Sequence, residues 1–140
     1  TLKLGQPLEL VIGMTGKESL TADTVAKVRA SWRQYPERYE TIFDQIGHLT
    51  VSASDAVKSG QLNELGELMN LCHGYLNALQ LSTPELEEMI HVARQNGAVG
   101  AKLTGGGGGG SMIALCPDSS GPVKTAIESA GYRTLAITLD

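Results

Sequence analysis

The stretch NGAVGAKLTGGGGGGSMIALCP, residues 96–117, is the most informative part of the chain. A short apolar run at 101–103 leads into six consecutive glycines, Gly105 to Gly110, and an unbroken apolar run at 112–116 follows them. Two β-prone runs joined by glycine predict a hairpin. Ordering glycine costs about 0.5–1 kcal/mol per residue more than ordering alanine, so we expect the run to serve a purpose.

A glycine run of this kind has two interpretations. One is a flexible linker, but linkers usually join polar flanks, whereas both flanks here are apolar and short. The other is a loop close to a phosphate, because a backbone without Cβ atoms can approach a ligand and turn successive N–H groups toward an anion. The P-loop pattern is excluded, because Ser111 and Met112 stand where Lys and Ser or Thr would be required.

The composition predicts one acidic domain over residues 1–140, with no metal site of its own. A net charge of −4 argues against nucleic acid or an anionic membrane as partner. Cys72 and Cys116 lack C-x-x-C spacing, so we expect two reduced thiols. We expect a cytoplasmic protein, since no apolar run is long enough to span a membrane and no secretory leader is present. The chain begins at Thr1, so we expect it to be part of a longer protein.

Hydrophobic periodicity predicts a strand, several helices, a hairpin, another helix and a last strand. The segment LELVIGM at 8–14 is closed by Thr15-Gly16 and indicates a buried strand. Ser19 or Thr21 is suited to cap the helix that follows. The expected helices begin at Ala22, cover 37–58 and 62–79, run from Pro84 to Asn96-Gly97, and cover 122–130, and the last strand is at 135–139.

This order of elements predicts an α+β fold of the ferredoxin-like, split βαβ type. We expect a four-stranded antiparallel sheet with helices packed on one face and extra helices in the first crossover. His48, His73 and His91 are too scattered to predict a metal site. A histidine within a helix, such as His73, is more often a surface or core-rim residue than a ligand.

The glycine stretch resembles a known motif. GAVGAKLT at 97–104, the glycines that follow and SMIAL at 111–115 resemble the third, C-terminal glycine motif of the GHMP kinases. The resemblance extends to LVIGMTG at 10–16, to Leu20-Thr21, and to MNLCHGYLNALQLSTPELEEMI at 69–90. Within that superfamily the middle stretch is most similar to the mevalonate kinases.

The resemblance implies an ATP- and Mg²⁺-dependent kinase that phosphorylates the primary hydroxyl of (R)-mevalonate in isoprenoid precursor synthesis. In this family the nucleotide-phosphate loop, the catalytic aspartate and its partner lysine lie in an N-terminal domain, which would also hold most of the ATP and Mg²⁺. None of these is found in this sequence. We therefore expect only the C-terminal domain here, with no catalytic residue, inactive alone, and paired with its own N-terminal domain. Homodimerisation is left open.

The family motif also assigns roles to particular residues. Those expected to support the phosphate loop of the missing domain are Thr104, Gly105, Gly106, Gly107, Gly108 and Gly109. Those expected near mevalonate are Thr21, Thr15 and Gly16. Lys102 is either a phosphate contact or a solvated strand lysine.

Some residues depart from the family pattern. Met14 stands where many relatives carry Asp, Leu20 where Ser is common, and Cys72 where we expect Asn. A polar contact to the substrate is therefore missing from the pattern, so phosphomevalonate or another small alcohol stays open as the acceptor. A function from a different class also stays open, namely a free-standing ferredoxin-like module whose glycine hairpin binds a nucleotide or other anion.

Overall fold

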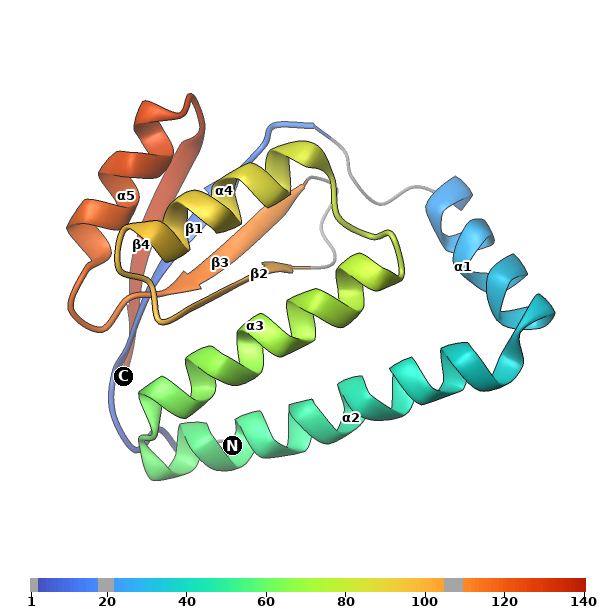
Figure 1. The fold of residues 1–140 in the computed structure, drawn as a ribbon. Helices are drawn as coiled ribbons and strands as arrows, with labels where there is room; N and C mark the ends of the chain where they lie inside the picture. Colours follow the sequence, from blue (N-terminus) through green and yellow to red (C-terminus); the bar gives the residue numbers. More distant parts are fainter. Residues whose placement is uncertain (1–2, 18–21, 105–109) are drawn as a thin grey trace.

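The computed structural model describes residues 3–17, 22–104 and 110–140. In chain order the elements are β1 (Leu8–Met14), α1 (Ala22–Gln34), α2 (Pro36–Ser59), α3 (Leu62–Ala78), α4 (Pro84–Gln95), β2 (Gly100–Thr104), β3 (Ser111–Leu115), α5 (Ser120–Ser129) and β4 (Arg133–Leu139). The strands form one sheet in the order β2-β3-β1-β4, and every neighbouring pair is antiparallel (Figure 1). The predicted ferredoxin-like arrangement is confirmed.

The boundaries of the elements follow local signals in the sequence. β1 covers the predicted residues, and Thr83 caps α4 by accepting a hydrogen bond from the Leu86 N–H at 3.2 Å. β4 begins at Arg133, earlier than predicted. α5 begins at Ser120 rather than Pro122, because proline is tolerated within the first helical turn, where its missing N–H has no partner to lose.

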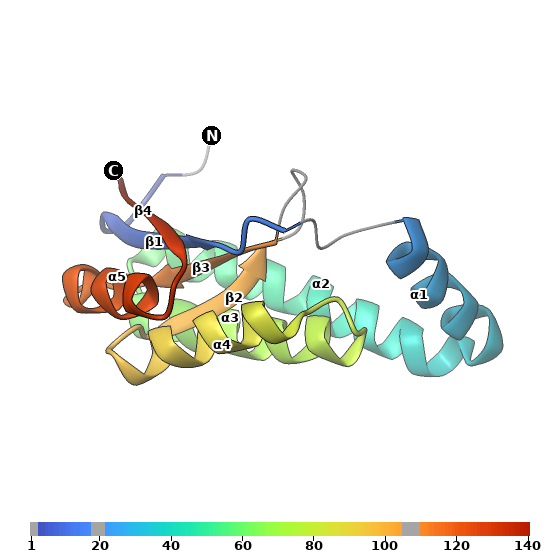
Figure 2. The same ribbon diagram turned by 90° about the horizontal axis from the view of Figure 1, so that it is seen from above.

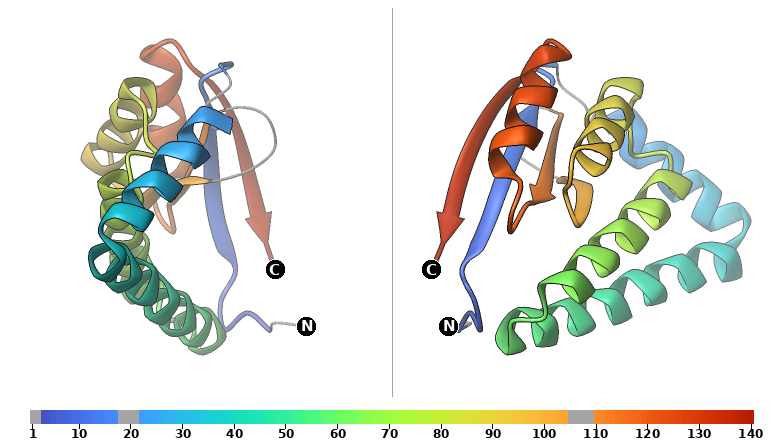
Figure 3. Two further views of the ribbon diagram at one scale, coloured as in Figure 1. Left: turned by 90° about the vertical axis from the view of Figure 1, so that its right-hand side faces the viewer. Right: turned by 60° about the vertical axis from the view of Figure 1, so that its left-hand side comes forward.

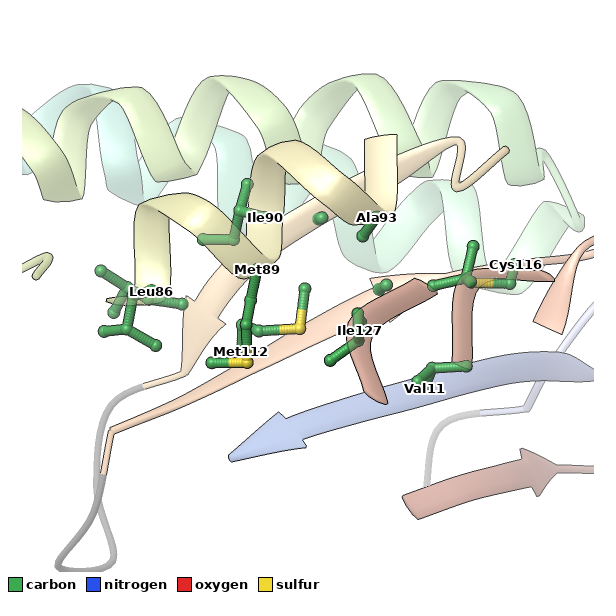
Figure 4. Packing of buried hydrophobic residues seen from close by; sticks show 12 residues of the cluster. Val11, Leu86, Met89, Ile90, Ala93, Met112, Cys116 and Ile127 are labelled. Atoms are coloured by element: carbon green, nitrogen blue, oxygen red, sulfur yellow. The ribbon is translucent and has the colours of Figure 1, made fainter. Parts of the chain in front are cut away.

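The main core lies between the sheet and the helices α4 and α5. Figure 4 shows Met89 and Ala93 of α4 and Ile127 of α5 gathered over Val11 and Met112 of the strands, and all of these side chains are buried. Side chains alternate along a strand, so the residues next to these point to the opposite side. Val11 of β1, Ala101 and Leu103 of β2, and Met112 and Ala114 of β3 therefore face this core.

A second core cluster joins the sheet to α2 and α3. Leu8, Leu10 and Leu115 are strand residues that pack there with Ala56 of α2 and Leu65 of α3. Figure 3 shows that the two helices diverge from the turn that joins them. This pairing holds α3 alongside the edge strand β2.

Helix α1 is packed differently from the rest of the fold. It buries none of its own residues, and Figure 2 shows it near the far end of α2, away from the strands. Trp32 of α1 and Phe43 of α2 meet edge to face, with ring centroids 5.6 Å apart. Among the described residues, no helix is long and apolar enough to cross a membrane.

Candidate functional site

The ends of three strands meet at one end of the sheet. Thr104, the last residue of β2, lies opposite Ser111, the first residue of β3, and Ser111 in turn lies opposite Met14, the last residue of β1. The predicted pairing of the two strands that flank the glycine run is therefore confirmed. The end of β1 is brought to the same place, although it is far away in the sequence.

The residues after β1 bind the last glycine of the run. The Thr15 N–H donates to the Gly110 carbonyl at 2.9 Å, and the Gly110 N–H donates to the Lys17 carbonyl at 2.7 Å. Gly16, between them, has φ of +73°, a left-handed conformation that glycine adopts without strain. The turn after β1 is thus held directly against Gly110.

The predicted site residues fall into two groups. Thr15, Gly16 and Thr104 lie within the described residues and gather at this end of the sheet. The Thr15 hydroxyl lies 3.1 Å from the carbonyl oxygens of both Gly110 and Lys17, so it is used in the turn. Thr21 and Gly105 to Gly109 lie outside the described residues.

The outer edge of β2 is occupied by side chains from helices. β2 is an edge strand, so the N–H and C=O groups on its outer side have no neighbouring strand. Asn70 of α3 accepts from the Ala101 N–H at 3.0 Å and also from Nε of Arg94 at 3.0 Å. The Arg94 guanidinium, in turn, donates to the Ala101 carbonyl at 2.9 Å. Helix side chains therefore take the place of a further strand.

The last outward N–H of β2 is held by a histidine. The Leu103 N–H donates to Nδ1 of His73 at 3.1 Å, and Nε2 of His73 lies 2.6 Å from Oε2 of Glu87 in α4. Ser82 donates to the same carboxylate oxygen at 2.7 Å. His73 is only 4% exposed, so the expectation that it is a surface or core-rim residue is wrong.

The electrostatics of this pair favour a neutral imidazole beside a carboxylate. Burial is the largest effect on the His73 pKa and lowers it from 6.5, whereas Glu87 acts in the opposite direction. Burial acts to raise the Glu87 pKa, but hydrogen bonds from Ser82 and His73 outweigh it, so the net pKa lies below 4.5. A backbone N–H can only donate, so Nδ1 carries no proton and Nε2–H faces Glu87.

Helix α3 lies close enough to β2 for Asn70 and His73 to reach the backbone of the strand. Gly66 of α3 and Gly100 of β2 pack backbone to backbone, and a Cβ atom on either would lie within 3.0 Å of the other segment. The sequence analysis missed Asn70 and His73 because their partners are 29 to 31 residues away. Their spacing of three along one helix face is the signal that was available.

Two further groups can be placed. Lys102 is half-buried and donates through Nζ to the Leu103 carbonyl at 2.7 Å, so its ammonium group is engaged with its own strand. Cys72 lines a small cavity of about 190 Å³ with Lys102 and side chains of α2 and α3. The described residues contain no group of three His, Cys, Asp or Glu side chains that would hold a metal ion.

The family follows from comparison with known proteins. The family model described as "GHMP kinases C terminal" matches residues 53–133, which include the strands on either side of the glycine run. The chain belongs to this family.

Individual relatives narrow the similarity. The chain is 45% identical over 129 residues to the mevalonate kinase of Pyrococcus horikoshii, an alignment that covers 89% of this chain and 38% of that protein. It is 40% identical over 119 residues to the mevalonate kinase of Methanothermobacter thermautotrophicus, covering 85% of this chain and 39% of that protein.

A solved structure gives the same picture in three dimensions. The mevalonate kinase of L. major in complex with R-mevalonate superimposes with a TM-score of 0.86 and 32% identity, over 99% of this chain and 44% of that chain. The present chain thus spans about two fifths of the length of the curated relatives it matches, 38% and 39% in the two proteins named above.

Proposed function

We propose that this chain is the C-terminal part of a mevalonate kinase, an enzyme that transfers the γ-phosphate of ATP to the primary hydroxyl of (R)-mevalonate. The observation that carries the proposal is the 45% identity to the Pyrococcus horikoshii mevalonate kinase, spread over 89% of this chain. The chain would work in the cytoplasm, in isoprenoid precursor synthesis, together with its own N-terminal domain.

This chain would form one wall of the active site. Phosphoryl transfer depends on positioning and on neutralising charge, so a rigid wall next to the phosphates contributes to the rate. Thr104 lies at the sheet end that leads into the glycine run, and we assign Thr104 and Gly105 to Gly109 to support of the phosphate loop. We assign Thr21, Thr15 and Gly16 to the mevalonate side.

The reacting groups would be held mainly outside this chain. When bound, Mg²⁺ would neutralise charge on the transferring phosphate. The described residues do not supply a set of three ligand side chains for it. What this chain contributes is the strand end at Thr104 and the turn at Thr15-Gly16, each tied to neighbouring backbone by hydrogen bonds.

The test is a kinase assay on the full-length protein. ADP formation with Mg-ATP should depend on mevalonate, and phosphomevalonate or other small alcohols should support much slower turnover. Preference for phosphomevalonate would reassign the acceptor within the family, and no turnover with any alcohol would refute the proposal. The 140-residue chain alone should be inactive.

The acceptor side can be tested separately. Replacing Thr21 by Ala in the full-length protein should mainly raise the KM for mevalonate, because a hydroxyl that contacts the substrate is removed. Replacing Ser59, whose hydroxyl binds the Asp55 carbonyl within α2 at 2.9 Å, by Ala is the matched control. Unchanged KM and turnover in the Thr21 variant would remove this residue from the mevalonate pocket.

A further inference from the structure

We propose that His73 and Glu87 form a positioning pair that sets the end of β2 at Thr104, and that turnover is full only while His73 is neutral. This inference rests on the proposed kinase function, because Thr104 is assigned there to the phosphate side of the active site. The pair itself touches neither substrate. It acts through the backbone of β2.

The hydrogen bonds of His73 determine its tautomer. Its Nδ1 accepts the Leu103 N–H at 3.1 Å, and a nitrogen that accepts a hydrogen bond carries no proton. The proton of the neutral ring is therefore on Nε2, which lies 2.6 Å from the Glu87 carboxylate. The two contacts together select one tautomer and one ring orientation.

Leu103 links His73 to the end of β2. It directly precedes Thr104, and Thr104 pairs with Ser111, on the other side of the glycine run. The Leu103 carbonyl is bound by Lys102 of the same strand, whereas the Leu103 N–H is bound by a helix. His73 is thus the contact that ties this end of β2 to α3, which is itself packed on the strand at Gly66.

Glu87 is held by its position in α4 and by a hydrogen bond from Ser82. It lies in the first turn of α4, where the partial positive charge of a helix N-terminus favours a carboxylate. Ser82 donates to its Oε2 at 2.7 Å, so the carboxylate is held from a second direction. An ionised and fixed Glu87 accepts from Nε2–H and keeps Nδ1 directed at β2.

Protonation of His73 in acid would change these contacts. The charged groups that face His73 are Glu87 and Arg94 of α4 and Lys102 of β2. Arg94 and Lys102 disfavour a second proton on the ring, whereas Glu87 favours it, and burial opposes it most strongly. Protonation at Nδ1 would place one donor against another, so the contact with the Leu103 N–H would break.

The first experiment compares three variants of the full-length protein. His73→Leu removes both hydrogen bonds and should lower kcat by about 10- to 100-fold, with KM for mevalonate within about twofold, because a small misplacement of a reacting group has an effect of this size. His73→Asn keeps an acceptor near the Nδ1 position and should recover most of kcat. His91→Leu, at an exposed position of α4, is the matched control and should match wild type.

Two outcomes of that comparison would overturn the proposal. One is a folded His73→Leu protein with kcat close to wild type. The other is an Asn variant as impaired as the Leu variant, which would mean that the ring volume matters and the acceptor does not. If the Leu variant fails to fold, the Asn variant and its pH profile decide.

The pH profile supplies a readout that a purely structural role would not change. Wild-type kcat should fall on the acid side of about pH 6.5, the usual histidine value. An asparagine side chain at position 73 does not titrate, so this fall should be reduced or absent in the Asn variant. An identical acid limb in both proteins would assign the titration to another group and overturn the proposal.

An activity-independent measurement separates this inference from the proposed function. Amide hydrogen exchange in the full-length protein should be at least about tenfold faster at Leu103 in His73→Leu, because an opened amide exchanges with water. Exchange at Ala101, which Asn70 holds, should change less. A wild-type protein without kinase activity refutes the function alone, whereas unchanged Leu103 exchange refutes the positioning pair.

Discussion

The two edges of the sheet are built in opposite ways. At the β2 edge, side chains of Asn70, His73 and Arg94 bind the outward backbone groups. At the β4 edge, the side chains of Leu135 and Leu139 are 53% and 45% exposed. An edge strand needs protection from unwanted pairing, and here the protected edge is the one that leads to the glycine run. The edge whose backbone groups are bound by helix side chains is thus the one next to the proposed phosphate side.

The largest expected effect is on the contact that brings α3 to β2. Replacing Gly100 by Ala should destabilise the fold by about 3 kcal/mol, because the new Cβ atom would meet the backbone of Gly66, which cannot move without separating helix and strand. Chemical denaturation of the full-length protein measures this change. The hydrogen bonds from Asn70 and His73 of α3 to β2 would then be lost together.

Gly74→Ala is the matched control. Gly74 lies on α3, the helix whose Gly66 contacts Gly100, and a Cβ atom at Gly74 would have nothing within 4 Å. Alanine in a helix is favoured over glycine by about 1 kcal/mol, so this variant should be as stable as wild type or slightly more stable. Equal effects of the two substitutions would show that the close approach of α3 to β2 is not important for stability.

The next effect concerns the middle of the same edge. Replacing Asn70 by Ala leaves the Ala101 N–H without its acceptor and removes a partner of Arg94, at a cost of about 1–3 kcal/mol. The unfolding free energy measures this cost. Asn77→Ala, at an exposed position of the same helix, should change it by less than about 0.5 kcal/mol. A cost for Asn70→Ala as small as the control would mean that water replaces the side chain.

The third effect is a loss of stability in acid. The folded pKa of His73 is lowered from 6.5 by burial, so the unfolded chain takes up the proton first. Stability is therefore full above about pH 6.5 and is lost as the pH falls through that value toward the folded pKa, by at most about 1.4 kcal/mol per pH unit for one group.

Wild type and His73→Asn should be compared between pH 7.5 and 5.5. His48 and His91 are present in both proteins, so the difference between the two curves isolates His73. Wild type should lose more stability than the Asn variant over this range. Parallel curves would contradict the prediction. The stabilisation that goes with the lowered pKa of Glu87 is full above about pH 4.5 and is lost only below that value, outside this window.

The smallest effect is expected at the opposite edge. Leu139 of β4 is 45% exposed, so replacing it by Thr, which also suits a strand, should change the unfolding free energy by about 0.5 kcal/mol or less. A much larger loss in the full-length protein would show that the rest of the chain covers this edge. The two edges would then be alike in being protected, by different means.

The strands and helices themselves were predictable because their signals are local. The apolar, β-branched run LELVIGM and the turn at Thr15-Gly16 place β1 with its correct ends. Thr83 and Pro84 mark the start of α4, and the apolar runs on either side of the glycines pair as a hairpin stem. Each of these patterns depends on residues a few positions apart, which is the range over which backbone geometry acts.

The candidate site was predictable only in part. Motif resemblance proposed Thr15, Gly16 and Thr104 as site residues, and the register of the sheet brings them to one end, but their roles remain a prediction. For His73, its place in a helix predicted only a surface or core-rim residue, because helical periodicity does not show what stands opposite a polar side chain. Nothing near Asn70 or His73 in the sequence indicates that their partners are backbone groups of a strand.

The sequence by itself determined the order of elements, the pairing of the strands on either side of the glycines and the family, since these depend on local periodicity and on a contiguous motif. The tertiary structure decided which edge of the sheet is protected and which histidine is buried. The physical reason is that Gly66 and Gly100 lie 34 positions apart in the sequence, and only their packing brings a helix within hydrogen-bond distance of β2. Side chains on that helix then find partners that only the folded chain supplies.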